Sequence, residues 1–417
     1  MNNKWNNFLK TLGPGILFAS TCIGVSHLVQ STRAGADYGF ALVWVVILAN
    51  LFKYPFFEFA SRYTSATGVS ILDGYYKKGR WILMVFAIVT MITMFIVTAA
   101  VTFVTAGLLS NLLNIKGFDT DTWVLVVLII STLVLTIGKY NLLDSLLKVI
   151  GTVLVISTLV AFVSALINGP IEKVPDFAAK EPFSNSGLIF IIALMGWMPT
   201  AVDMSTWTSL WTEARIKQTG YYPKLKETLL DFNIGYLVSG VLAVFFLSLG
   251  AMVIFGSGTD LSNNSTTFAQ QLISMYTNSI GQWSYLIISV AAFSTMFSTS
   301  IAVMDGYSRS MARATKLLLG RKSEESKREF VVWTIILTLG TYLVATQFVN
   351  ALKSLVDLAT IISFVIAPLA GFLNYKVIFS KEVGIDFIPP KWLKRLAVAG
   401  LIFLSIFTVV YLVQLVI

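Results

Sequence analysis

The chain is poor in cysteine, histidine and charged residues, and each scarcity excludes a class of protein. A single cysteine, Cys22, cannot form a disulfide within the chain, which excludes a disulfide-stapled secreted domain. A single histidine, with no catalytic dyad and no phosphate-binding loop, argues against an enzyme and against an ATP-driven pump. Charged residues make up 12% of the 417 positions, roughly half their share in a soluble domain. A water-soluble globular protein is therefore not expected.

Hydrophobic residues make up 56% of the chain, and they gather in runs of about 20 residues, the length that an α-helix needs to cross a bilayer. Unpaired backbone groups are too costly in lipid, so these runs must be helical. The first run follows a short polar segment that has no features of a cleavable signal peptide. The sequence predicts an all-α integral membrane protein with one transmembrane domain over residues 1–417.

We expect about eleven transmembrane helices, placed by the apolar runs. Their approximate ranges are 13–32, 39–62, 81–109, 121–138, 143–168, 186–211, 229–255, 280–304, 330–348, 353–379 and 395–417.

Lysine and arginine alternate between rich and poor loops along this plan. The net charge of +9 lies largely in every second short loop, which is the pattern of membrane topology and not of a nucleic-acid-binding surface. The richest loop, 306–329, is also predicted to hold a short amphipathic helix. Because positive loops stay inside, we expect the N-terminus in the cytoplasm and the C-terminus outside, in a bacterial plasma membrane.

The first and sixth predicted spans carry interruptions near their middles. The first contains Gly24, followed by Ser26 and His27, and the sixth contains Gly196 and Pro199. Such breaks survive in a membrane where they line a cavity or are buried in protein. Interrupted helices at matching positions of two five-helix units indicate an inverted repeat with its binding site at the midplane. We assign the repeats to about 13–168 and 186–379, and an extra helix to about 395–417.

Several short motifs occur in an order that resembles a known family. They are Gly13-Pro14-Gly15, Gly35 to Gly39, Ala60-Ser61-Arg62, Met198-Pro199, Asp231 and Val303 to Tyr307. In this order and spacing the chain resembles the Nramp family (natural resistance-associated macrophage proteins) of divalent-metal transporters. The resemblance implies the LeuT-like fold of the amino acid–polyamine–cation superfamily, with helices 1 and 6 interrupted, and no cofactor.

The departures from this family lie where its chemistry lies. The family's first helix carries Asp-Pro-Gly-Asn, whose Asp and Asn bind the metal, and this chain has Gly24-Val25-Ser26-His27 there. The family's Met is kept as Met198, but the His after Met-Pro is Thr200. The third and ninth spans lack charged residues in their middles, where the family has its proton path. We therefore expect weak proton coupling or none.

The candidate binding residues lie at the two interruptions. They are Gly24, His27, Met195, Met198, Thr200 and Asp203. An imidazole and a thioether are ligands for transition metals such as manganese or iron. A carboxylate would offset the cost of dehydrating the ion, as Asp203 could in place of the missing acid.

Each of these candidates also has a structural interpretation. His27 could be a hydrogen-bonded packing residue, Met198 a core residue, and Asp203 the partner of a basic residue such as Arg215. The spacing of Glu58 with Arg62, and of Lys353 with Asp357, predicts structural ion pairs along a helix.

Three functions remain open. The first is a secondary transporter or facilitator of divalent metal ions by alternating access. The second is a transporter of a small organic solute such as an amino acid, and the third is a non-transporting membrane sensor. The position of Asp203 relative to the midplane cavity discriminates between the first two.

Overall fold

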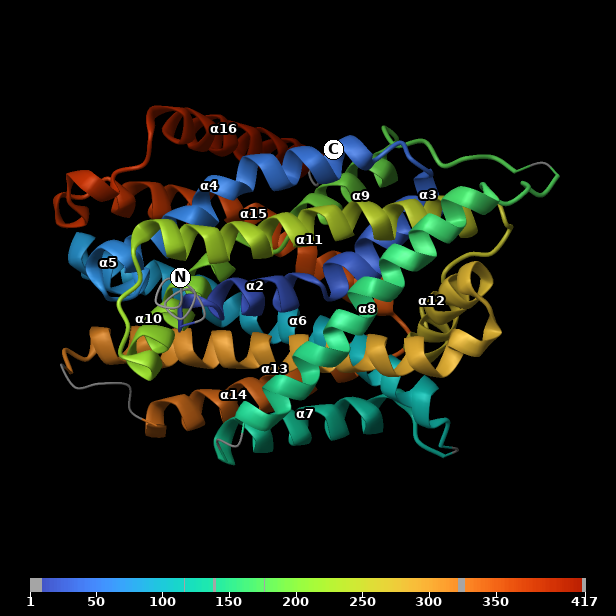
Figure 1. Ribbon diagram of the computed structural model, residues 1–417, viewed down its shortest axis with the longest axis horizontal. Helices are drawn as coiled ribbons and strands as arrows, with labels where there is room; N and C mark the ends of the chain where they lie inside the picture. The colour runs from blue at the N-terminus through green and yellow to red at the C-terminus, as the bar shows by residue number, and fades with distance from the viewer. Residues whose placement is uncertain (1–9, 116, 138–139, 176, 322–326, 415–417) are drawn as a thin grey trace, which may run out of the picture.

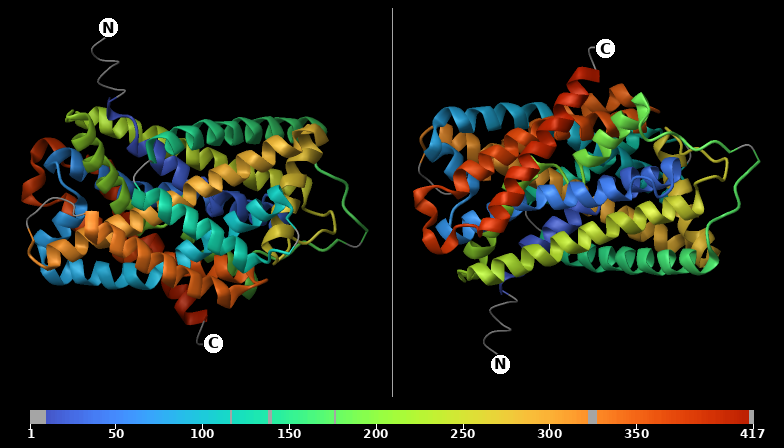
Figure 2. Two further views of the ribbon diagram at one scale, coloured as in Figure 1. Left: turned by 90° about the horizontal axis from the view of Figure 1, so that it is seen from below. Right: turned by 90° about the horizontal axis from the view of Figure 1, so that it is seen from above.

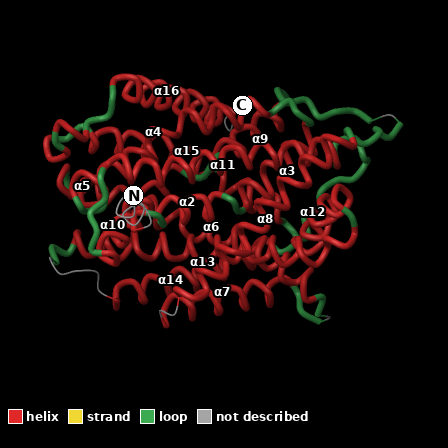
Figure 3. Tube along the Cα trace, viewed as in Figure 1, coloured by secondary structure: helices red, strands yellow, loops and turns green. Residues whose placement is uncertain are grey.

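The computed structural model describes residues 10–115, 117–137, 140–175, 177–321 and 327–414, and among these residues the regular elements are all helices (Figure 3). The long α-helices are α4 (Val43–Thr67), α6 (Arg80–Leu113), α7 (Thr120–Ile137), α8 (Tyr140–Asn168), α11 (Leu225–Val253), α13 (Tyr285–Leu318), α14 (Lys327–Ala345), α15 (Leu352–Ile378) and α16 (Lys391–Gln414). The shorter ones include α2 (Pro14–Cys22), the π-helix η1 (Ser26–Ser31), α3 (Thr32–Tyr38), α5 (Ile71–Lys78), α9 (Asn185–Gly196), the 3₁₀ helix η2 (Val202–Met204), α10 (Ser205–Thr219) and α12 (Ser265–Ile280). Four further 3₁₀ helices are η3 (Gln282–Ser284), η4 (Thr346–Phe348), η5 (Lys381–Val383) and η6 (Ile385–Phe387).

The helices form a bundle whose long members run along the longest axis of the molecule (Figure 1). The short helices α5 and α12 lie at opposite ends of it, and the further views show the same arrangement (Figure 2). Eight described helices are long and apolar enough to cross a membrane, and α9 and part of α8 are shorter apolar helices. Each of the predicted spans corresponds to one of these helices or to a broken pair, which confirms the predicted fold class.

Both predicted interruptions are present. The first span is divided between α2 and the pair η1 and α3, with residues 23 and 24 outside regular helix. The sixth is divided between α9 and the pair η2 and α10, with residues 197–201 between them. Gly24 and Pro199 lie within these two segments. The local signals were sufficient here because glycine and proline weaken a helix wherever they occur.

Two details of the loops differ from prediction. The segment from Gly306 was expected to leave the membrane as a loop with its own short helix, but α13 continues without interruption to Leu318. The loop expected to connect spans 7 and 8 contains α12, whose N-terminus is capped by the Asn264 side chain. The apolar runs mark where a helix is in lipid, but an amphipathic continuation beyond the bilayer has no such signal.

Helix α11 packs closely against both halves of the broken first span. A Cβ atom on Gly235 would lie 2.1 Å from the carbonyl oxygen of Gly15 in α2. A Cβ atom on Gly250 would lie 2.3 Å from the carbonyl oxygen of Thr32 in α3. Small residues allow two helix backbones to approach in this way. The two half-helices are thus held by a common neighbour on either side of their break.

Candidate functional site

The break in the sixth span exposes backbone carbonyls that α9 cannot use. The last carbonyls of a helix have no partner further along it. At this break the Met195 carbonyl accepts the Met198 N–H at 3.4 Å, and the remaining acceptors need another donor. Lys53 of α4 takes this role. Its Nζ donates to the carbonyl oxygens of Met195 at 2.5 Å, Gly196 at 2.8 Å and Thr200 at 3.1 Å. The carbonyls at the break therefore form a small shell around a cation.

The geometry around Lys53 matches an ammonium ion. Three carbonyl oxygens can only accept, and an ammonium group has three N–H donors whereas a neutral amine has two. The residue is fully buried in the middle of α4, and the C-terminal end of a helix such as α9 carries partial negative charge that favours a cation. The carbonyls of Met195, Gly196 and Thr200 thus favour a positive charge in two ways: they point at it as hydrogen-bond acceptors, and they lie at the negative end of the α9 dipole.

Asp203 supplies the negative charge beside this shell. It lies in η2, is 7% exposed, and interacts electrostatically with Lys53. Backbone groups of Asp203 and Met204 hydrogen-bond its carboxylate, which places the anion at the start of the second half-helix, where it is favoured. Charged side chains therefore pair with the exposed backbone groups on both sides of the break: Lys53 with the carbonyls and Asp203 with the N–H groups.

Met198 and Thr200 lie within the same break. Met198 is fully buried, and its sulfur accepts a hydrogen bond from Ser31 of η1 at 3.7 Å. The hydroxyl of Thr200 donates to the sulfur of Met204 at 3.0 Å. The contact between Ser31 and Met198 joins the two broken spans, so the interruptions face one another as an inverted repeat requires.

Gly24 and His27 belong to the first break and make different contacts. A Cβ atom on Gly24 would lie 2.7 Å from a side-chain carbon of Thr299, so the break packs directly on α13. His27 is fully buried; its Nδ1 lies 2.8 Å from the Ser26 hydroxyl and its Nε2 2.8 Å from the Ser239 carbonyl oxygen. Both ring nitrogens are engaged, and this geometry favours the packing interpretation of His27 over the ligand interpretation.

The structure thus brings the carbonyls of Met195 and Thr200 onto Lys53. Met198 lies in the same break, Asp203 in the helix that follows it, and His27 is directed toward α11. Among the described residues no group of three or more His, Cys, Asp and Glu side chains is placed to hold a metal ion. A cation bound here would be coordinated mainly by backbone carbonyls, one carboxylate and a thioether.

A charged network closes the site toward the end of the bundle that carries α12. Arg33 of α3 forms a two-pronged ion pair with Asp357 of α15, at 2.6 and 3.0 Å. Gln30 donates to the same carboxylate at 3.0 Å.

The predicted pairing of Asp357 with Lys353 is wrong, because helix spacing considers neighbours on one helix only and Asp357 faces a different helix. The predicted pair of Glu58 and Arg62 is confirmed at 2.5 Å.

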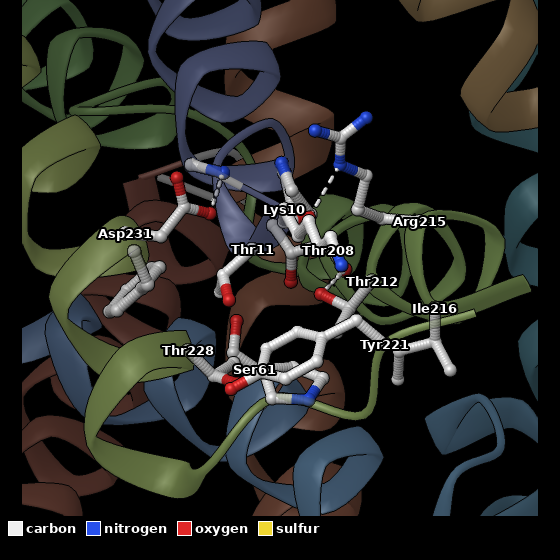
Figure 4. Close-up of a pocket in the computed structure, with 14 residues that line it drawn as sticks. Lys10, Thr11, Ser61, Thr208, Thr212, Arg215, Ile216, Tyr221, Thr228 and Asp231 are labelled. Atoms are coloured by element: carbon white, nitrogen blue, oxygen red, sulfur yellow. Dashed lines mark hydrogen bonds between the residues drawn. The ribbon is translucent and has the colours of Figure 1, made fainter. Parts of the chain in front are cut away.

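A second set of contacts holds a half-helix at the opposite end, where α2 begins (Figure 4). We call this set the Asp231 latch and the Arg33–Asp357 pair the Arg33 latch. The Asp231 carboxylate of α11 accepts from the backbone N–H of Gly15 at 2.6 Å and of Gly13 at 3.4 Å. Arg215 donates to the carbonyl oxygen of Lys10 at 2.9 Å. These contacts border a small pocket whose lining includes Thr208 and Tyr221. Each half of the broken first span is therefore held by a carboxylate from another helix, α2 at its N-terminus and α3 near its start.

The sequence did not single out Lys53 or Arg33. Lys53 offered one usable signal, since an ionisable residue in the middle of an apolar span is normally functional. Its partners are 142 to 147 residues away, and no local spacing reveals them.

Comparisons with known proteins agree with this architecture. The family described as "Natural resistance-associated macrophage protein-like" matches residues 15–414. A Pasteurella multocida protein named "Uncharacterized protein PM0681" is 36% identical over 416 residues, covering 99% of this chain and 94% of its own. The divalent metal cation transporter MntH of Staphylococcus aureus is 26% identical over 281 residues, which cover 62% of this chain and 58% of that protein.

Solved structures share the fold at low identity. A mutant of the Eremococcus coleocola manganese transporter superposes with a TM-score of 0.74 at 13% identity, covering 98% of this chain and 87% of that one. MhsT in complex with L-phenylalanine superposes with a TM-score of 0.61 at 12% identity, covering 96% and 98%. A manganese transporter and a protein solved with bound L-phenylalanine are thus both similar to this chain in fold.

Proposed function

Since the chain belongs to the Nramp family, we propose that this multi-pass membrane protein is a secondary transporter of divalent cations. The observation that carries the proposal is the carbonyl shell of Met195, Gly196 and Thr200, which holds a positive charge at the break of the sixth span. A manganese-like or iron-like ion is the proposed cargo, in keeping with the thioether of Met198. The related MntH and the manganese transporter support this choice of cargo.

The proposed mechanism is alternating access around the two breaks. The Asp231 contacts hold α2 at one end and the Arg33–Asp357 pair holds α3 at the other. Opening one latch at a time would expose the buried site to one side of the membrane, by movement of a half-helix around the break. Asp203 supplies the charge that the first span lacks, and no catalytic step is involved.

We further propose that transport is weakly coupled to protons or not coupled. The middles of α6 and α14, which correspond to the third and ninth predicted spans, carry no charged residue. A passage for protons through these helices therefore lacks titratable groups. The predicted orientation, with the N-terminus in the cytoplasm, places the Asp231 latch at the inner end.

The test is isothermal titration of the purified protein with manganese, magnesium and zinc. Saturable binding of manganese that weakens in Met198→Ala and in Asp203→Asn supports the proposal. A folded protein that binds none of the three ions contradicts it.

A small organic solute is the second candidate, and one observation favours it. Lys53 already fills the carbonyl shell that a cation would use, and the first break offers no carboxylate. Trp197 lies beside the break, with its ring nitrogen donating to Ser363 at 2.9 Å, and could pack on an organic molecule. Uptake of labelled amino acids without any metal binding would establish this alternative.

A further inference from the structure

Lys53 occupies the position that the proposed cargo requires. Its ammonium contacts all three carbonyls of the shell and interacts with Asp203. A divalent ion on the same carbonyls would lie within a few ångströms of that ammonium, and like charges this close repel strongly inside a protein. The ion and the Lys53 ammonium therefore exclude one another from the shell.

We propose that Lys53 is an internal substitute for the cargo: its ammonium fills the shell in the empty transporter, is displaced when a divalent ion binds, and returns when the ion leaves. This inference rests on the proposed cation transport. Lys53 then sets the affinity for the divalent ion and allows the empty transporter to reorient, with no change in the protonation of its side chain.

The empty transporter is the state that needs such a substitute. A transporter that moves an ion without a coupled partner must reverse its orientation with the site vacant. The carbonyl shell would then lose the N–H donors of Lys53, and the Asp203 carboxylate its neighbouring positive charge, while both stay buried, which is unfavourable. The Lys53 ammonium satisfies both, so the empty site can close.

The structure also offers a route for displacement. Lys53 carries its charge on a flexible stem of four carbons, and Asp203 lies within electrostatic reach of it. The ammonium can leave Met195 while staying near a negative neighbour. A rigid cationic group could not move off the carbonyls in this way when an ion binds.

The test compares two modes of manganese movement in proteoliposomes. Net uptake into metal-free vesicles requires the empty transporter to reorient, whereas exchange into manganese-loaded vesicles does not. In Lys53→Met we expect tighter binding by at least about 10-fold, retained exchange, and net uptake reduced by more than about 10-fold. Lys53→Gln keeps N–H donors for the carbonyls but removes the charge, and should behave in the same way. Lys376→Met makes the same chemical change on the surface of α15 and should resemble the wild type.

The outcomes separate the inference from the proposed function. Equal losses of exchange and net uptake at unchanged affinity would give Lys53 a purely structural role and overturn the inference, while metal transport stands. Binding by Lys53→Met but not by the wild type would also overturn it, because the ammonium then never leaves. No binding by any folded variant contradicts the metal cargo itself. If neither Lys53 variant folds, the wild type decides: manganese exchange into loaded vesicles with no net uptake into metal-free vesicles overturns the inference.

Discussion

The ammonium nitrogen of Lys53 lies 2.5 Å from the carbonyl oxygen of Met195, a residue 142 positions away in the chain. This contact joins the middle of α4 to the broken end of α9, and it places a positive charge on a carbonyl that the break has released. The helix break is therefore a cation-binding element even without a metal. The following predictions depend on this contact or on the latches at either end of the site.

Asp203 should determine cation affinity. Asp203→Asn keeps the size and the hydrogen-bond acceptor but removes the charge beside the shell, so manganese affinity should fall by more than about 10-fold. Titration calorimetry measures the change, and Asp386→Asn, in the short 3₁₀ helix Ile385–Phe387 and exposed, serves as the matched control. Unchanged affinity in Asp203→Asn would exclude this carboxylate from the site.

His27 should stabilise the fold more than it binds cargo. In His27→Ala the buried groups of Ser26 and Ser239 lose their ring partners, which costs roughly 1–3 kcal/mol. We expect a lower melting temperature with manganese affinity close to the wild type. Loss of manganese binding at an unchanged melting temperature would instead identify His27 as a ligand.

The Asp231 latch should control access from the end where α2 begins. Asp231→Asn removes the negative charge at the N-terminus of α2, where a carboxylate contributes about 0.3–1 kcal/mol. Cys22 is the last residue of α2, is fully buried, and is the one cysteine of the chain. A maleimide should therefore label Cys22 several-fold faster in Asp231→Asn than in the wild type.

The control for this experiment is Asp260→Asn, on an exposed loop away from α2. Equal labelling rates in the wild type and both variants would show that the Asp231 contact does not hold α2 closed. Labelling that slows when manganese is added would connect the latch to occupancy of the site.

The close contact of α9 with α15 should tolerate no side chain at Gly196. A Cβ atom there would lie 2.0 Å from the carbonyl oxygen of Thr360, so Gly196→Ala must shift a backbone and should cost roughly 1–3 kcal/mol. Gly240→Ala is the control, since its Cβ would meet only the Asn50 side chain at 3.3 Å. A comparison of melting temperatures in detergent tests the difference, and equal values would contradict it.

The sequence was informative wherever the signal is local. The length of each apolar run located the spans, and Gly24 and Pro199 marked the two breaks. The pair Glu58 and Arg62 was predictable because both residues lie one turn apart on α4.

The same reasoning failed for contacts between helices. Lys353 and Asp357 have the same spacing as Glu58 and Arg62, yet Asp357 pairs with Arg33, 324 residues away. Lys53 was passed over because its partners are backbone carbonyls of another helix, which leave no trace in residue type. The candidate residues Met195, Met198, Thr200 and Asp203 lie together at one break, and their role as ligands stays a prediction.

Anomalous diffraction from crystals grown with manganese tests the central claim most directly. Transport of a divalent cation at the break predicts a manganese peak beside the Met195 carbonyl oxygen and the Asp203 carboxylate, with the Lys53 ammonium moved away from Met195. Saturating manganese that leaves Lys53 on all three carbonyls, with no peak at the break, would contradict it.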